Sequence, residues 1–263
     1  MKPDTAPRLS ARNVSVTRGR RTIVHDATLA LNTGELTVLA GPNGAGKTTL
    51  ARAMAGVIAC DGTVSFDGQD LLAMAPRARA RALAYLPQGH QFHWPMSVRS
   101  IVALGREPHA DPFSQQSATD RAAIQRAMEA TDIEDFSART ITTLSGGERA
   151  RVAMARALAT EASVLIADEP TASLDERNQL IVMELLQQVA RSGAAVLAII
   201  HDLALAMRFA DRVVLMNEGR IVANDEPQLT LTPERIAAVF GISVNRVETP
   251  DGPLLIPSRA IRN

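Results

Sequence analysis

Short apolar runs alternate along this chain with segments of helical periodicity. Four runs are short and densely apolar, as expected of strands covered on both faces of a sheet: 36–40, 164–167, 195–200 and 213–216. Helices are expected at 47–55, ending at Gly56, and at 179–190, ending near Gly193. The alternation predicts a parallel sheet with crossover helices, and therefore an α/β fold.

The pattern changes between residues 89 and 144, where strand-like runs vanish. Ser117 and Asp120 have the spacing of a helix start ahead of a helical segment at 122–130. We therefore expect a mostly helical insertion. Near the C-terminus, a helix is expected at 233–240, and Pro250-Asp251-Gly252 is typical of a turn between two small strands. This last part is interpreted as an appendage without visible chemistry.

A phosphate-binding motif stands between the first predicted strand and the helix that follows. The motif G-x-x-x-x-G-K-[ST] is satisfied by Gly41, Pro42, Asn43, Gly44, Ala45, Gly46, Lys47, Thr48 and Thr49. Its glycines let backbone N–H groups converge on phosphate oxygens, beside the positive end of a helix. Lys47 is expected to reach the β- and γ-phosphates, and Thr48 to bind Mg²⁺. The alternative is a glycine-rich turn with an incidental lysine.

Two carboxylates, Asp168 and Glu169, end the apolar run 164–167. In P-loop proteins an acid at this place holds Mg²⁺, which is the role predicted for Asp168. Glu169 would then orient and deprotonate an attacking water. Paired acids at a strand end are by themselves more often a solvated cap, but their place downstream of a P-loop favours catalysis.

Two further polar residues follow apolar runs. His201 comes directly after 195–200, and Gln88 after 83–87. A lone histidine beside an apolar run is usually a hydrogen-bonded core residue. Because other strand ends point at the same nucleotide, His201 is interpreted as a donor to the γ-phosphate. Gln88 is interpreted as a contact of the γ-phosphate, Mg²⁺ or water.

A capping box is expected at the sequence Leu144-Ser145-Gly146-Gly147-Glu148. Ser145 would be the N-cap, with Glu148 three residues later. Gly146 and Gly147 leave backbone N–H groups open to an anion. Local physics alone favours a well-capped helix and nothing more.

Taken together, these segments resemble the ATP-binding subunits of ABC transporters over residues 8–230. The family's six motifs occur in order: Walker A at 41–49, the Q-loop at Gln88, the LSGGE signature at 144–148, Walker B at 164–169, the D-loop at 173–175 and the switch histidine at His201. The resemblance implies an ATPase with a P-loop NTPase (RecA-like) core, a helical subdomain inserted at about 89–157, and a small C-terminal extension at 231–263.

The family also implies a head-to-tail homodimer, in which each copy completes the other's site. Ser145, Gly146, Gly147 and Asp175 of one copy would meet the γ-phosphate held by Lys47 of the other. ATP and Mg²⁺ are the implied cofactors, with Thr48, Gln88 and Asp168 as metal ligands. Arg18 stands where many members carry a tyrosine that stacks on adenine. A guanidinium also stacks on purines, so the choice between ATP and GTP stays open.

Looser cues at 102–106, 108–109, 231–234 and 239–241 resemble importers of iron-siderophores, haem and cobalamin. That likeness implies membrane permease subunits, a periplasmic binding protein and a place on the cytoplasmic face of the bacterial inner membrane. Another transport system, an ABC ATPase acting on nucleic acid or the ribosome, and a non-hydrolysing regulator are the alternatives. His90, His93 and Trp94, next to Gln88, are interpreted as a docking surface for the permease rather than a metal site.

Composition narrows these alternatives. The 28 Lys and Arg balance the 28 Asp and Glu, which argues against a dedicated nucleic-acid binder. The single cysteine, Cys60, excludes an internal disulfide and a thiolate zinc cluster, and a reducing compartment is expected. The longest apolar stretch, 194–200, is far below the roughly 20 residues that span a bilayer. The chain is therefore expected to be soluble and to serve a membrane from its side.

Overall fold

A six-stranded sheet forms the centre of the computed structural model, which describes residues 6–89, 92, 94–111, 116–172, 174–249 and 252–261. Five strands are parallel and β10 is antiparallel to β9. Their spatial order is β10 (Arg220–Asp225), β9 (Arg212–Asn217), β3 (Leu36–Ala40), β8 (Ala195–Ile199), β7 (Val164–Asp168) and β6 (Leu83–Leu86). The four predicted strands are confirmed within a residue or two, and β6 and β10 join them.

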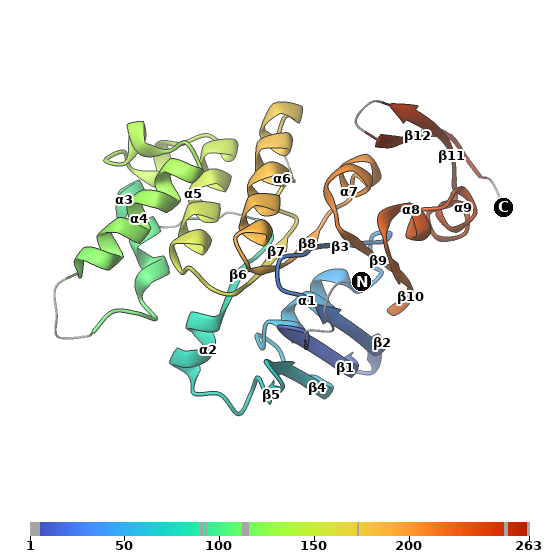
Figure 1. Ribbon diagram of the computed structural model, residues 1–263, viewed down its shortest axis with the longest axis horizontal. Coiled ribbons are helices and arrows are strands. Elements are labelled where there is room, and N and C mark those ends of the chain that lie inside the picture. Colours follow the sequence, from blue (N-terminus) through green and yellow to red (C-terminus); the bar gives the residue numbers. More distant parts are fainter. Residues whose placement is uncertain are drawn as a thin grey trace.

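Both faces of this sheet are covered, one by several helices and the other by a helix and a second sheet, which is why the strands are apolar throughout (Figure 1). Leu165 and Ala167 pack among α5 (Gly146–Ala159), α6 (Glu176–Arg191) and α7 (Leu203–Phe209). Val164 and Ile166 point the other way, toward α1 (Lys47–Met54). Successive side chains of a strand alternate between faces, so every strand residue becomes buried.

The second cover is an antiparallel sheet that the apolar pattern did not predict. It consists of β2 (Arg21–Leu31), β1 (Leu9–Arg18), β4 (Asp61–Phe66) and β5 (Gln69–Asp70), in that order. The register of β1 shifts against both neighbours, and Asn13 and Asp26 have left-handed φ values of 50° and 47°. These irregularities break the strict alternation that identifies a strand in sequence.

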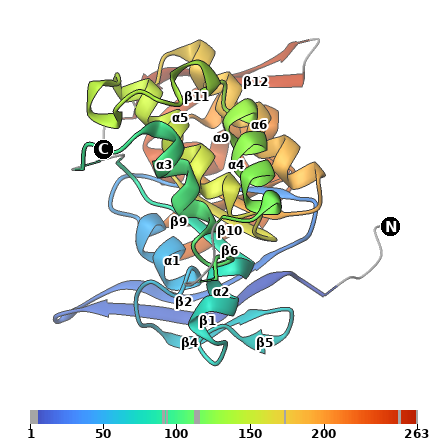
Figure 2. The same ribbon diagram turned by 90° about the vertical axis from the view of Figure 1, so that its left-hand side faces the viewer.

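The insertion is helical, as predicted. It contains α3 (Val98–Ala103), η1 (Leu104–Arg106), α4 (Ala118–Ala130), η2 (Glu134–Phe136) and η3 (Ile141–Thr143), and it follows α2 (Pro76–Ala82) and β6. Val98, Ile124 and Val152 are fully buried in a core that these helices share with α5. The capping box of Ser117 and Asp120 starts α4. Figure 2 looks onto α3, α4 and α5, with the antiparallel sheet at the opposite end.

The C-terminal part consists of α8 (Pro227–Thr230), α9 (Pro233–Phe240), β11 (Ile242–Thr249) and β12 (Gly252–Ala260). The predicted helix at 233–240 and the two-stranded ribbon are confirmed. Pro250 and Asp251 of the predicted turn lie outside the described residues. The ribbon packs against α7 and α9. Among the residues that the structure describes, no helix is long and apolar enough to cross a membrane.

Candidate functional site

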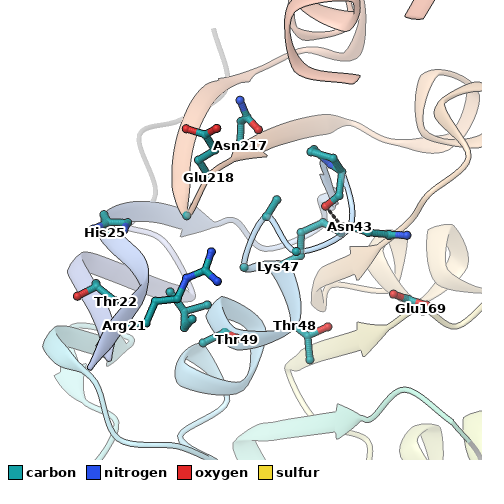
Figure 3. Close-up of a pocket in the computed structure, with 16 residues that line it drawn as sticks. Arg21, Thr22, His25, Asn43, Lys47, Thr48, Thr49, Glu169, Asn217 and Glu218 are labelled. Atoms are coloured by element: carbon teal, nitrogen blue, oxygen red, sulfur yellow. Dashed lines mark hydrogen bonds between the residues drawn. The ribbon is translucent and has the colours of Figure 1, made fainter. Parts of the chain in front are cut away.

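A cavity of about 850 Å³ opens above the N-terminus of α1 (Figure 3). Its floor is the loop 42–49, and one wall comes from β2 through Arg21, Thr22, Ile23 and His25. Asn217 at the end of β9, with Glu218 and Gly219 of the turn to β10, lines another side, and Glu169 lies at the far end. Small-ligand sites in proteins have volumes of roughly 300–1,000 Å³, so a nucleotide fits in size.

Close packing fixes the glycines of the phosphate loop. A Cβ on Gly41 would lie 2.2 Å from the Met216 carbonyl oxygen, and one on Gly46 would lie 2.9 Å from the Ile23 carbonyl oxygen. Gly46 is also the N-cap of α1, with a left-handed φ of 96°. The loop therefore lies tightly against β9 and β2, and the free N–H groups at the start of α1 face the cavity. Helix N-termini of this kind attract phosphate.

Lys47 is held at the mouth of this loop. Its Nζ donates hydrogen bonds to the carbonyl oxygens of Gly41, at 2.8 Å, and Pro42, at 2.9 Å. Burial lowers the pKa of the Lys47 ammonium, and the nearby carboxylates of Glu169 and Asp168 oppose that shift. The side chain is thus already positioned beside the place where a triphosphate would lie.

Asp168 lies fully buried at the end of β7. The Thr48 hydroxyl donates to its Oδ1 at 3.0 Å, and the Tyr85 hydroxyl donates to its Oδ2 at 3.0 Å. Burial raises the pKa of this carboxyl, while the two hydrogen bonds lower it. A hydroxyl and a carboxylate side by side are hard oxygen ligands of the kind that Mg²⁺ prefers.

The Glu169 carboxylate forms hydrogen bonds with residues that follow the two neighbouring strands, β6 and β8. Gln88 Nε2 donates to its Oε2 at 2.7 Å, and a hydrogen bond of 2.7 Å joins His201 Nε2 to its Oε1. Its backbone has a φ of 54°, a left-handed conformation that is uncommon outside glycine. Such strain is found where a side chain must be aimed. The structure thus brings the three predicted catalytic residues together, at the edge of the cavity.

The signature segment forms a second, separate surface. Ser145 and Glu148 make a reciprocal capping box: Ser145 Oγ accepts from the Glu148 N–H at 3.2 Å, and Glu148 Oε2 accepts from the Ser145 N–H at 2.7 Å. A small cleft of about 210 Å³ joins Ser145 and Gly147 to Asp175, the N-cap of α6. Gly146 follows Ser145 as the first residue of α5. Ser173 lies outside the described residues. None of the described residues of this surface lines the phosphate-loop cavity.

Arg18 is not among the residues that line the cavity. It ends β1, exposed, directly opposite Arg21 in the hairpin. Figure 3 places the Arg21 guanidinium between His25 and the loop that carries Lys47. Sequence analysis did not single out Arg21; Arg18-Gly19-Arg20-Arg21 between alternating strand residues was the hairpin signal that would have located it.

The motif beside Gln88 is described only in part. His90 and His93 lie outside the described residues, while Trp94 is 75% exposed. Of the two aromatic side chains that the structure describes in this segment, Phe92 is partly buried against the core, and Trp94 is open to solvent. Tryptophan is enriched at protein–protein interfaces, so the exposed Trp94 is a candidate for contact with another protein.

Comparison with known proteins decides the family. A family model described as "ABC transporter" matches residues 24–172. This chain belongs to the ABC transporter family. The predicted family and α/β P-loop fold are confirmed, and with them the predictions that the chain binds ATP and is an ATPase.

The sequences of related proteins align with most of this chain. It is 42% identical over 259 residues to the hemin import ATP-binding protein HmuV of Myxococcus xanthus (strain DK1622), covering 95% of this chain and 96% of that protein. It is 44% identical over 224 residues to the cobalamin import ATP-binding protein BtuD of Halobacterium salinarum (strain ATCC 29341 / DSM 671 / R1), covering 84% of this chain and 56% of that protein. A solved chain of a metal-chelate type ABC transporter in an inward-facing conformation superposes with a TM-score of 0.81 at 25% identity, covering 95% of this chain and 97% of that one.

Proposed function

We propose that this ATPase energises the import of a metal chelate through separate membrane permease subunits. The observation that supports ATP hydrolysis is the position of the Glu169 carboxylate beside the phosphate loop. Its two oxygens lie 2.7 Å from Gln88 Nε2 and 2.7 Å from His201 Nε2. A binding protein without turnover has no use for an aimed and strained carboxylate at this place. The names of the relatives, which import hemin and cobalamin, support the class of cargo.

In this mechanism the phosphates of ATP lie on the N–H groups of the loop 41–49, and Lys47 exchanges its two carbonyl partners for phosphate oxygens. Glu169 orients a water molecule and takes its proton as the water attacks the γ-phosphate. His201 Nε2, which carries the hydrogen in its bond to the carboxylate, can donate that hydrogen to the phosphate instead.

Thr48, Asp168 and Gln88 offer a hydroxyl, a carboxylate and an amide oxygen, a donor set that fits Mg²⁺. When bound, the ion neutralises part of the phosphate charge. Replacing Thr48 with valine removes one oxygen ligand with little change in volume, so this variant should need more Mg²⁺ for ATP hydrolysis. An unchanged Mg²⁺ requirement would exclude Thr48 as a ligand.

The active unit is proposed to be a head-to-tail homodimer. One chain holds the phosphate loop and the signature surface apart, and Gly147, in the first turn of α5, lines an open cleft beside Ser145, with Gly146 between them in the chain. In the dimer, Ser145, these glycines and Asp175 would meet the γ-phosphate held by the partner. The affinity gained through that phosphate would favour closure with ATP and opening after hydrolysis.

Ser145→Arg tests this arrangement, because the larger side chain fills the cleft without touching the phosphate loop of its own chain. ATP should still bind the monomer, and ATP-dependent dimerisation, measured by light scattering, should be lost. Normal dimerisation of the variant would refute the cross-subunit role.

At the end of the cavity where the nucleotide base would lie, we propose that Arg18 and Arg21 hold the purine between their guanidinium groups. Residues opposite each other in an antiparallel pair share a face of the sheet, so both side chains extend on the side where Arg21 reaches the cavity. Arg18→Ala and Arg21→Ala should weaken binding of ATP but not of inorganic tripolyphosphate, which lacks a base. Equal losses for both ligands would show a phosphate contact instead.

For transport, the proposal includes the permease subunits, a periplasmic binding protein that selects the chelate, and a place on the cytoplasmic face of the bacterial inner membrane. The exposed Trp94, beside Gln88, is proposed as part of the permease contact. Cells lacking this gene should regain uptake of one of three cargoes, haem, cobalamin or a ferric siderophore, on expression of the native chain but not of Lys47→Ala. Failure to restore any of the three uptakes would refute metal-chelate import.

We also propose that residues 8–230 are the ATP-binding domain and 231–263 a small C-terminal extension that packs against it. The helical core shared by α3, α4 and α5 supports an inserted subdomain at about 89–157. A chain that ends at residue 230 tests the boundary: ADP should still bind, and loss of the fold would refute it.

A further inference from the structure

Both oxygens of the buried Asp168 carboxylate accept hydrogen bonds, one directly from helix α1 and the other from Tyr85, which is itself bonded to α1. Thr48 in α1 donates to Oδ1 at 3.0 Å. Tyr85 in β6 donates to Oδ2 at 3.0 Å, and Arg52, one turn after Thr48 in α1, donates from Nε to the Tyr85 oxygen at 3.4 Å. Residues four apart lie on the same face of a helix. Helix α1 therefore holds the carboxylate at one oxygen directly and at the other through Tyr85.

Arg52 decides the direction of the tyrosine hydrogen bond. A guanidinium has only donors, so the Tyr85 oxygen accepts from Arg52 and its own hydrogen points to Asp168. Burial raises the pKa of Tyr85 to about 12, so the phenol keeps its hydrogen at physiological pH. A hydrogen-bonded phenol of this kind fixes the rotation of the carboxylate, because Oδ2 stays at the tyrosine and Oδ1 faces Thr48.

We propose that Tyr85, set by Arg52, is a positioning residue that keeps Oδ1 of Asp168 turned toward the magnesium site at Thr48. The inference rests on the metal site of the proposed function. It adds a residue that lies outside the phosphate loop and the strand-end acids, and it assigns a task to the chain's single tyrosine.

Tyr85→Phe tests the proposal by removing one hydroxyl and nothing else. The expected result is about tenfold weaker binding of Mn²⁺, followed by electron paramagnetic resonance with ADP-loaded protein, as befits one hydrogen bond to a charged group. ADP affinity in EDTA should not change. Ser163→Ala is the control, because its hydroxyl bonds the Ala82 carbonyl at the opposite end of β6 and β7. Mn²⁺ affinity equal to that of the native chain would overturn the proposal.

A second variant separates this inference from the metal site itself. Asp168→Asn should lose Mn²⁺ affinity whether or not Tyr85 matters. If its Mn²⁺ affinity equals that of the native chain, the metal site itself is refuted. If Asp168→Asn loses Mn²⁺ affinity and Tyr85→Phe does not, only the role of Tyr85 is refuted. If Tyr85→Phe fails to fold, the native chain still gives an answer: Mg²⁺ added with ADP should change the ultraviolet absorbance of the one tyrosine, and no change would overturn the proposal.

Discussion

Replacing Glu169 with glutamine should remove catalysis while leaving the site intact. The two side chains have nearly the same shape, and both partners of Glu169 can be kept. The new carbonyl oxygen accepts from Gln88 Nε2, which leaves the Gln88 oxygen free for Mg²⁺, and the new NH₂ group donates to His201 Nε2 when the imidazole carries its hydrogen on Nδ1. The variant therefore loses the proton acceptor and no contact. A positioned general base contributes about 10²- to 10⁴-fold in rate, or about 2.7–5.5 kcal/mol of activation free energy.

The assay is phosphate release at saturating ATP, with nucleotide affinity measured on the same preparation. The rate should fall at least about 100-fold, ATP affinity should stay unchanged, and the ATP-loaded protein should elute as a dimer. Glu184→Gln, an exposed glutamate in α6, is the matched control and should keep the native rate. A Glu169→Gln rate within tenfold of the native one would refute the role of base, and a parallel loss of ATP affinity would show that the side chain is structural.

Substitutions at three further positions test backbone strain, an ion pair and close packing by urea unfolding. At the left-handed Glu169, glycine should be about 1 kcal/mol more stable than alanine, because only alanine carries the strain of a Cβ there, and equal stability would contradict that strain. Asp120→Asn should cost about 2 kcal/mol by breaking the 2.8 Å ion pair with the buried Arg106, which keeps its second ion pair with Glu161. Ser117 and Arg106 lower the pKa of Asp120, so the cost should be complete at neutral pH and shrink as the pH falls through that lowered value; a cost independent of pH would contradict this. Gly105→Ala should cost about 2 kcal/mol, because its Cβ would lie 2.2 Å from a carbonyl oxygen of α5, and a neutral effect would show that the backbone yields.

Local patterns were enough to predict the elements that carry the phosphate chemistry. The strands β3, β7 and β8 are apolar throughout because both sheet faces are covered, and Gly41 and Gly46 sit where no Cβ fits. Short-range spacing also predicted the capping boxes at Ser117 and Ser145. Each of these features depends on residues that are close together in the chain.

The local sequence pattern could not predict features that depend on how distant segments of the chain pair. The contact of Tyr85 with Asp168 joins residues 83 positions apart, and it exists because β6 lies beside β7. The antiparallel sheet was missed because Asn13 and Asp26 interrupt its alternation. The hairpin signal at 18–21 would have located Arg21 in a turn, but only the packing of that hairpin against the phosphate loop shows that Arg21 lines the cavity.

Mixing two inactive variants tests most directly whether two copies enclose the nucleotide. Lys47→Ala disables the phosphate loop, and Ser145→Arg disables the signature surface, so neither homodimer contains a complete site. A mixed head-to-tail dimer pairs the intact loop of one chain with the intact signature of the other, which rebuilds one site of the two. Mixing should therefore restore ATP-dependent dimerisation that neither variant shows alone, and no restoration at any mixing ratio would contradict the shared site.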